Sequence, residues 1–365
     1  MEEQIKELEE QISKTKYNKA TESHIGKLKA KIARLTAEDE RRKSVKTSTR
    51  GFYIKKAGNA TVALVGFPSV GKSTILNQLT GAKSEVGAYN FTTLNVVPGI
   101  MEYNHAKIQI LDMPGLIKGA SGGRGRGREV IAAARSADVI LLVVDVFNSD
   151  ISVLFNELYN AAIRLNQHKP DVTITSGDQG GIQVKPTMKL TKIDVRTVRE
   201  MTAAYGYVNA TVVIREDINV EQMLDVLAGN RVYIKAVMAI NKVDIATRNE
   251  LERAKECNRE YKQFLCSAAT GAGMEELKQG LYDTIDMIRV YLKPQGQKAD
   301  MDIPLIVKRG NTVEDICELI HRQFRSNFRY AMIWGKSVKF PGQTVGLEHV
   351  VMDEDILCIV VRKSF

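Results

Sequence analysis

The chain has 365 residues, of which 44% are hydrophobic and 26% charged, a composition that excludes wholesale disorder and leaves room for two or three domains. It shows neither an apolar run approaching the ~20 residues of a membrane span nor an N-terminal apolar block, so we expect a cytoplasmic protein without membrane association. The net charge of +9 suits an acidic partner such as RNA, and a solvated basic surface is an equally good interpretation.

Two helices are predicted at the N-terminal end. Apolar residues recur at intervals of three and four from Ile5 to Ile12 and again from Ile25 to Leu35. We expect a hairpin whose seams pack on each other or on the main domain, and a dimerisation device is the alternative. Residues 41–56 are basic and read as a linker that could contact phosphates or simply be solvated. Residues 1–58 are therefore predicted to form a helical region and a basic linker.

Short β-branched runs, each followed by a turn or a helix, then predict an α/β domain with a mostly parallel sheet and helices on both faces. These runs are Thr61–Val65, Lys107–Leu111, Val139–Val144, Val237–Ile240 and Gln263–Cys266. One face of a closing helix is marked by Met274, Leu277, Leu281, Ile285 and Ile288.

From about Arg289 the pattern changes to that of a small α+β module. Strand-like runs at Ile303–Val307, Tyr330–Trp334 and Ile356–Val361 accompany a helix that we expect Thr312 to cap. Trp334 lies in an apolar run and is expected in the core.

The first strand of the α/β domain leads into a GxxxxGKS loop, the pattern of a phosphate-binding loop. Its residues are Gly66, Phe67, Pro68, Ser69, Val70, Gly71, Lys72 and Ser73, and Thr74 follows in the next helix. Glycines let backbone N–H groups surround phosphates, and the helix N-terminus adds its positive end. We expect Lys72 to neutralise β- and γ-phosphate oxygens and the Ser73 hydroxyl to bind Mg²⁺.

Two further segments are expected to complete the phosphate and metal site. They are Asp112, Met113, Pro114 and Gly115 after the second strand, and Phe91, Thr92, Thr93 and Leu94 before it. Asp112 can reach the metal through water, and Gly115 can donate its N–H to the γ-phosphate. A threonine in the other segment could close over Mg²⁺ and the γ-phosphate, as in a switch loop. Taken alone, that segment would read as a plain surface loop.

Base selection is predicted from residues that follow the last two strands. These are Asn241, Lys242, Val243 and Asp244, and then Ser267, Ala268 and Ala269. The Asp244 carboxylate can accept hydrogen bonds from both the N1–H and the exocyclic amine of guanine. Adenine offers no such pair, which disfavours a kinase or an ATPase. The Ser267-Ala268 backbone would donate to the guanine oxygen.

Taken together, GFPSVGKST, FTTL, DMPG, NKVD and SA resemble the translation-factor-type GTPases, specifically the developmentally regulated GTP-binding proteins of the Obg-like group. The resemblance extends to GASGGRGRGREVIAAAR, RLNQHKP, GNRVY and YAMIWG, and the phrases RED at 215–217 and GLEH at 346–349 favour the second eukaryotic subtype. It implies a P-loop GTPase domain over 59–288 with an inserted subdomain at about 171–225, a TGS domain of β-grasp fold over 289–365, and an N-terminal helical appendage.

We therefore expect an enzyme that hydrolyses GTP to GDP and phosphate with Mg²⁺ and acts as a molecular switch associated with ribosomes and translation. Lys72, Thr93 and Gly115 are the expected catalytic residues, and Ser73 and Thr93 the metal ligands, Thr93 being preferred to Thr92 by resemblance. A scaffold that binds nucleotide and RNA or protein with negligible turnover is the alternative. The implied partners are GTP or GDP, a regulatory protein dedicated to the family, and the ribosome or RNA, but not DNA.

Leu116 stands where Ras-type proteins carry the glutamine that orients the attacking water, so slow intrinsic hydrolysis is expected. Relatives that share the hydrophobic replacement are often helped by K⁺, and we expect the same stimulation here. Ser69 departs from the asparagine that many of these potassium users carry.

Overall fold

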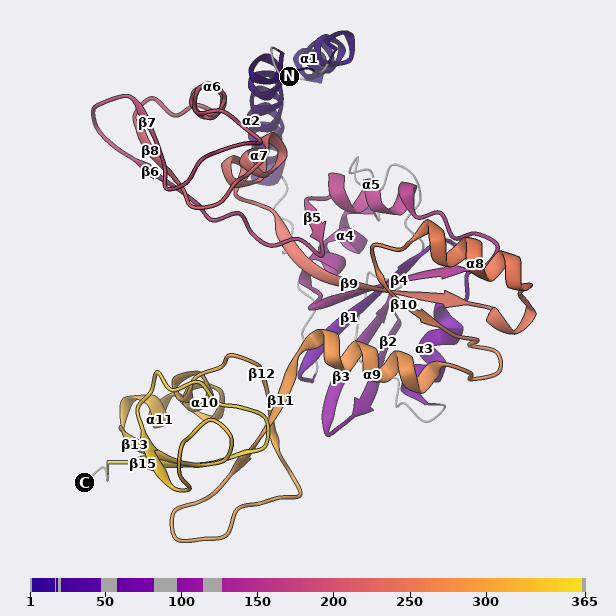
Figure 1. The fold of residues 1–365 in the computed structure, drawn as a ribbon, viewed down its shortest axis with the longest axis vertical. Coiled ribbons are helices and arrows are strands. Elements are labelled where there is room, and N and C mark those ends of the chain that lie inside the picture. Colours follow the sequence, from indigo (N-terminus) through magenta and orange to yellow (C-terminus); the bar gives the residue numbers. More distant parts are fainter. Residues whose placement is uncertain are drawn as a thin grey trace. The chain divides into compact units, whose positions relative to one another are not determined.

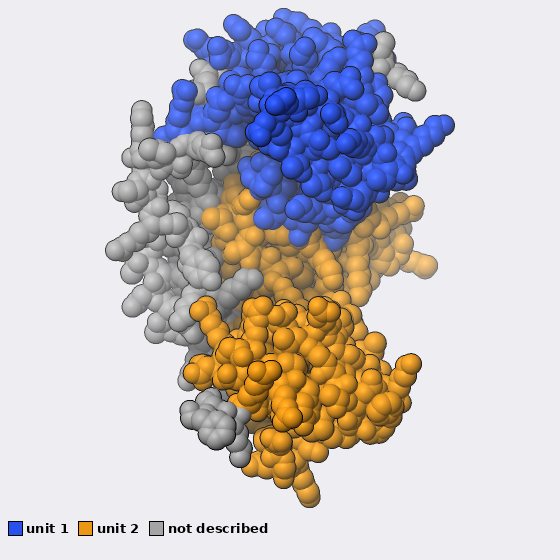
Figure 2. Space-filling model, turned by 90° about the vertical axis from the view of Figure 1, so that its left-hand side faces the viewer, with its two compact units in different colours: residues 1–52, 162–233 blue, residues 53–161, 234–365 orange. Residues whose placement is uncertain are grey.

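The computed structural model describes residues 2–16, 18, 21–46, 58–81, 97–113 and 127–362. The chain divides into two compact units (Figure 2). Unit 1 combines residues 1–52 with 162–233, and unit 2 combines residues 53–161 with 234–365. Each unit is thus assembled from two separated stretches of sequence.

Unit 2 is built on a sheet whose strand order is β10-β9-β4-β1-β3-β2 (Figure 1). The strands are β1 (Ala60–Gly66), β2 (Val97–Tyr103), β3 (Ala106–Asp112), β4 (Val139–Asp145), β9 (Val232–Asn241) and β10 (Lys262–Leu265). The short strand β5 (Ile163–Leu165) lies within the residue range of unit 1. Neighbours along the order are parallel except β2 and β3, which are antiparallel. The predicted α/β class with a mostly parallel sheet is confirmed.

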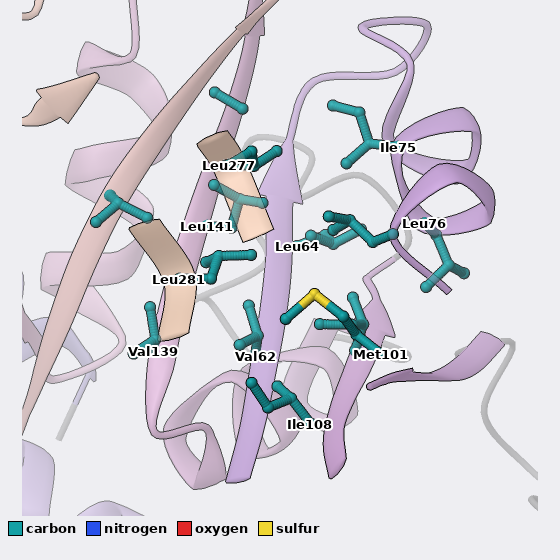
Figure 3. Packing of buried hydrophobic residues seen from close by; sticks show 14 of the residues in the cluster. Val62, Leu64, Ile75, Leu76, Met101, Ile108, Val139, Leu141, Leu277 and Leu281 are labelled. Atoms are coloured by element: carbon teal, nitrogen blue, oxygen red, sulfur yellow. The ribbon is translucent and has the colours of Figure 1, made fainter. Parts of the chain in front are cut away.

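Helices cover both faces of this sheet (Figure 1). They are α3 (Lys72–Thr80), α4 (Gly127–Ser136), α5 (Ser152–Asn160), α8 (Arg248–Cys257) and α9 (Met274–Ile285), with a short 3-10 helix, η1 (Val243–Ile245). On one face, Ile75 and Leu76 of α3 and Leu277 and Leu281 of α9 pack against β1 residues such as Leu64 (Figure 3). Every residue of β1 and β4 is buried, because a parallel sheet with helices on both faces has no solvent side.

The closing helix ends earlier than the apolar pattern indicated. α9 stops at Ile285, and Asp286 turns the chain with a left-handed φ of 63°. Ile288 therefore lies in β11 (Met287–Leu292), where it joins the core of the C-terminal part. Its placement on the helix was wrong, because a buried strand residue carries the same apolar signal as a buried helix residue.

The C-terminal part of unit 2 is a five-stranded sheet of order β12-β11-β15-β13-β14 with two helices. Its further elements are β12 (Leu305–Lys308), α10 (Val313–Ile320), α11 (Arg322–Ser326), β13 (Phe328–Trp334), β14 (Gln343–Val345) and β15 (Asp355–Val361). Thr312 caps α10 as predicted, in a reciprocal pair of hydrogen bonds with Asp315. Trp334 is only half-buried and lies outside the core cluster, with the Lys293 ammonium 4.2 Å from its ring centroid.

Unit 1 joins the N-terminal helices to the inserted segment. Its elements are α1 (Glu2–Lys14), α2 (Glu22–Lys46), β6 (Val172–Ser176), β7 (Ile182–Pro186), α6 (Val195–Tyr205), β8 (Ala210–Ile214) and α7 (Val220–Ala228), and the strands form a sheet of order β6-β8-β7. The α2 helix packs closely on α6, since a Cβ atom on Gly26 would lie 3.0 Å from the Met201 sulfur. The α2 helix thus contacts α6 and α7 as well as α1. The helix also runs through residues 41–46, which we had assigned to the linker, while residues 47–57 lie outside the described part.

Candidate functional site

The carboxyl ends of the parallel strands meet at one edge of the sheet, and the predicted site segments follow these ends. Residues 66–73 run from the last residue of β1 through the connecting loop into the first turn of α3, Asp112 ends β3, Asn241 ends β9, and residues 267–269 follow β10. In open α/β sheets this edge is where ligands bind. The predicted residues Phe91, Thr92, Thr93, Pro114 and Gly115 lie outside the described part of the chain, as does Leu116.

Two glycines of the phosphate loop are required by close approaches. A Cβ atom on Gly66 would lie 2.3 Å from the Val143 carbonyl oxygen of the neighbouring strand. Gly71 has φ of +95°, and a Cβ atom there would lie 2.3 Å from the Asn241 side-chain nitrogen. Ser69 also adopts a left-handed φ of 64°. The loop is thus shaped by contacts with β4 and β9 as well as by its own sequence.

Lys72 begins α3 with its side chain folded over the loop. Its ammonium donates to the carbonyl oxygens of Gly66, at 3.1 Å, and Phe67, at 2.8 Å. Burial lowers the pKa of Lys72, and the Asp112 charge partly opposes that shift. A phosphate would stabilise the partly buried ammonium, because direct charge pairing would replace the hydration that burial removes.

The remaining residues of the phosphate loop differ in their exposure to solvent. Pro68 and Ser69 are exposed at the tip, whereas Val70 is buried beneath it. Thr74 is exposed in the first turn of α3.

Ser73 and Asp112 form the candidate metal site. The Ser73 hydroxyl donates to Oδ2 of Asp112 at 2.6 Å. The other oxygen of this carboxylate, Oδ1, is buried and has no hydrogen-bond partner among the described residues. An orphaned carboxylate oxygen beside a hydroxyl fits Mg²⁺ or its bound water, since this ion prefers oxygen ligands. Met113 is buried and serves the core.

Asn241 connects the phosphate loop to the base-selecting loops. Its side-chain Nδ2 donates to the Val70 carbonyl oxygen at 2.9 Å, and its Oδ1 accepts from the Ala268 N–H at 2.9 Å. Val243 and Asp244 follow in η1, and Asp244 is exposed, so its carboxylate is accessible to a ligand.

The three residues expected to offer an amide to the guanine oxygen differ in how their N–H groups are engaged. The Ser267 N–H donates to the Ala272 carbonyl oxygen at 2.9 Å, and the Ala268 N–H is taken by Asn241. The Ala269 N–H makes no hydrogen bond within the described part of the chain, so it is the available donor of the three. The donor to the guanine oxygen stays a prediction for the segment Ser267–Ala269, and Ala269 is the member whose N–H is not engaged by a described residue.

Asp145 is a site residue that the sequence reading missed. Its Oδ2 lies 2.6 Å from the Lys242 ammonium, and the Asp145 side chain is buried. A sequence signal was present, because Asp145 directly follows an apolar strand run, as Asp112 and Asn241 do. Acids and amides at such strand ends face the same edge of the sheet.

Comparison with known proteins yields three family models that together cover most of the chain. They are the 50S ribosome-binding GTPase over residues 61–177, the C-terminal region of that domain over 179–287, and the TGS domain over 288–361. An uncharacterised GTP-binding protein of Methanocaldococcus jannaschii is 53% identical, with 100% of this chain and 93% of the relative covered. The human developmentally-regulated GTP-binding protein 2 is 41% identical, with 99% of each chain covered.

Among solved structures, the YchF GTPase of Schizosaccharomyces pombe matches with a TM-score of 0.46 and 14% identity, over 84% of this chain and 99% of that one.

Gly71→Ala should impair nucleotide binding. The added Cβ would displace the Asn241 amide and break its bond to Val70, and it would strain the left-handed backbone. We expect GDP affinity to fall at least about fivefold, since a lost buried hydrogen bond costs ~1–3 kcal/mol. Gly229→Ala is the matched control, because Gly229 also has a left-handed φ, of 64°, with its nearest neighbour 4.0 Å from the added atom. Equal GDP affinities of the two variants in calorimetric titration would contradict the proposed fit.

Proposed function

This chain belongs to the family of GTP-binding proteins that combine a GTPase domain of the 50S ribosome-binding type with a TGS domain, and we propose that it hydrolyses GTP to GDP and phosphate as a molecular switch. The observation that supports this most is the convergence at one sheet edge of a lysine-bearing phosphate loop, the Ser73–Asp112 oxygen pair and the exposed Asp244. This set can bind the phosphates and the base of one nucleotide.

In the proposed reaction, water attacks the γ-phosphate while the chain stabilises the charge that develops on its oxygens. Lys72 and the N–H groups at the start of α3 would bind the β- and γ-phosphates. Thr93 and Gly115 are proposed to act at the γ-phosphate. Mg²⁺ bound with the nucleotide would neutralise phosphate charge, and Ser73, Thr93 and Asp112 are the residues that would hold it.

The nucleotide's own oxygens would have to complete the metal shell. The described part of the chain contains no group of three or more histidine, cysteine or acidic side chains that could hold a metal ion.

The rate of phosphate release from GTP distinguishes a hydrolase from a scaffold that only binds the nucleotide. Unaided Ras-type proteins turn over at ~10⁻⁴–10⁻³ per second, and a chain with Leu116 in place of the glutamine should be no faster. We expect multiple-turnover phosphate release in this range, faster in potassium than in sodium chloride at matched ionic strength, and abolished in Lys72→Ala. Release no faster than in Lys72→Ala would favour the scaffold, and equal rates in both salts would remove the role of K⁺.

Asp244→Asn should change base preference. The amide would place a donor against the guanine N–H groups, so GTP affinity should fall more than about tenfold, at ~1.5–3 kcal/mol per lost charged hydrogen bond. Xanthosine triphosphate presents an acceptor at that position and should bind the variant better than the wild type does. Competition titrations with both nucleotides measure this change in base preference. A wild type that binds ATP as well as GTP would refute the assignment.

We propose that residues 59–288 form the GTPase domain, interrupted by the inserted subdomain at about 171–225, and that residues 1–58 and 289–365 serve partners. A ribosomal or RNA partner is supported by the cation–aromatic pairs of the C-terminal part, Lys293 with Trp334 and Arg329 with Tyr330. Such pairs can stack bases and neutralise phosphates. Phe340, with 60% of its surface exposed, is available for the same purpose.

The family resemblance further supports three narrower proposals: a dedicated regulatory protein as partner, a cytoplasmic location, and membership of the second eukaryotic subtype. No helix in the described residues is long and apolar enough to cross a membrane.

A further inference from the structure

The turn that presents Asp244 begins with a residue in an unfavourable backbone conformation. Lys242, which precedes η1, has φ of 64° and ψ of 32°, the left-handed region that side chains other than glycine seldom adopt. Such a conformation persists only where surrounding contacts hold it. The direction in which the next two residues leave the sheet depends on it.

The side chain of Lys242 is held by Asp145 from the neighbouring strand. The ammonium lies 2.6 Å from Oδ2 of Asp145, whose side chain is 8% exposed, while that of Lys242 is 33% exposed. The register of β4 and β9 places Asp145 directly opposite Asn241, the residue before Lys242. The pair therefore ties the first residue of the turn to the end of the adjacent strand.

Asp145 is itself fixed by backbone donors. Its Oδ1 accepts from the N–H groups of Phe147, at 3.1 Å, and Asn148, at 2.8 Å. The Val146 N–H in turn donates to the Asn241 carbonyl oxygen at 3.3 Å. With one oxygen committed to its own loop, Asp145 offers the other to Lys242 in a single orientation.

We propose that Asp145 is a positioning residue for guanine recognition, which acts through Lys242 to hold the Asp244 carboxylate where it meets both N–H groups of the base. The proposal rests on the proposed role of Asp244. Asp145 would not touch the nucleotide. Loss of the pair should weaken contacts with the exocyclic amine of guanine more than contacts with the phosphates.

Asp145→Asn isolates this pair. The amide oxygen can still accept from Phe147 and Asn148, whereas the amide nitrogen would place a donor against the Lys242 ammonium. The test compares dissociation constants of the full chain for GDP and for inosine diphosphate, which lacks the exocyclic amine. We expect GDP affinity to fall about tenfold and the preference for GDP over inosine diphosphate to shrink at least about threefold.

The structure offers a matched control next to the other end of β4. Asp138 precedes β4 at the opposite edge of the sheet, where it accepts from the Lys308 ammonium at 2.8 Å and the Thr61 N–H at 2.9 Å. Asp138→Asn breaks an equivalent acid–lysine pair far from the site, and the preference for GDP should not change. If Asp145→Asn weakens GDP and inosine diphosphate equally, or leaves both unchanged, the positioning role is overturned.

Two further variants distinguish the positioning role of Asp145 from the role of Asp244 in guanine recognition. Lys242→Met removes the ammonium and keeps the aliphatic chain, so it should reduce the preference as Asp145→Asn does, with little further loss in the double variant. It also carries the test if Asp145→Asn does not fold, and an unchanged preference would then overturn the proposal. Asp244→Ala should abolish the preference. If it does not, the assignment of Asp244 is wrong and the positioning role falls with it, whereas failure of Asp145→Asn alone leaves Asp244 as the guanine reader.

Discussion

The side-chain amide of Asn241 is the contact on which the site depends. It is 3% exposed and uses its nitrogen on Val70 and its oxygen on Ala268, both at 2.9 Å. One residue therefore joins the phosphate loop after β1 to the loop after β10. The same nitrogen occupies the space that a side chain at position 71 would need, which explains the glycine there. Phosphate and base contacts are consequently held at a fixed separation, as a nucleotide requires.

The sheet supplies the rigidity behind this contact. Strands β1 and β4 are buried along their whole length, and interiors packed at this density resist small displacements. Because the strands run parallel, their ends deliver Gly66, Asp112, Asp145 and Asn241 to one edge. The opposite edge carries Asp138 and its contact with Lys308 of the C-terminal part. The candidate site and the contact with the C-terminal part thus lie at opposite ends of the strands.

Much of the site could be predicted from the sequence, because it depends on short contiguous runs after buried strands. The phosphate loop, Asp112 and the segment from Asn241 to Asp244 are of this kind. The N–H of Ala269, free among the described residues, and the Asp145–Lys242 pair could not be predicted in the same way. Each depends on which hydrogen-bonding or charged groups are already paired with a residue that is distant in the sequence. The Ala268 N–H donates to Asn241 from a buried position, whereas Ala269 is exposed.

The fold, too, combines features that follow from contiguous sequence with features that depend on distant residues. The apolar pattern of α2 indicates that the helix packs on something, but the α6 residue nearest to Gly26, Met201, lies more than 150 positions away in the sequence. The spacing of apolar residues within one helix does not show which distant helix packs on it. Ile288 was misplaced for a related reason, since the chain reverses at Asp286 through a left-handed residue that is not glycine.

If one amide joins phosphate binding to base binding, its removal should weaken binding of the whole nucleotide, and calorimetric titration of GDP into Asn241→Ala tests this most directly. The variant loses both bonds and retains the buried strands. We predict a GDP affinity at least about tenfold below that of the wild type, with an unchanged far-ultraviolet circular dichroism spectrum. Wild-type affinity in a folded Asn241→Ala protein would contradict the account, because the loops would then hold the nucleotide without the amide that connects them.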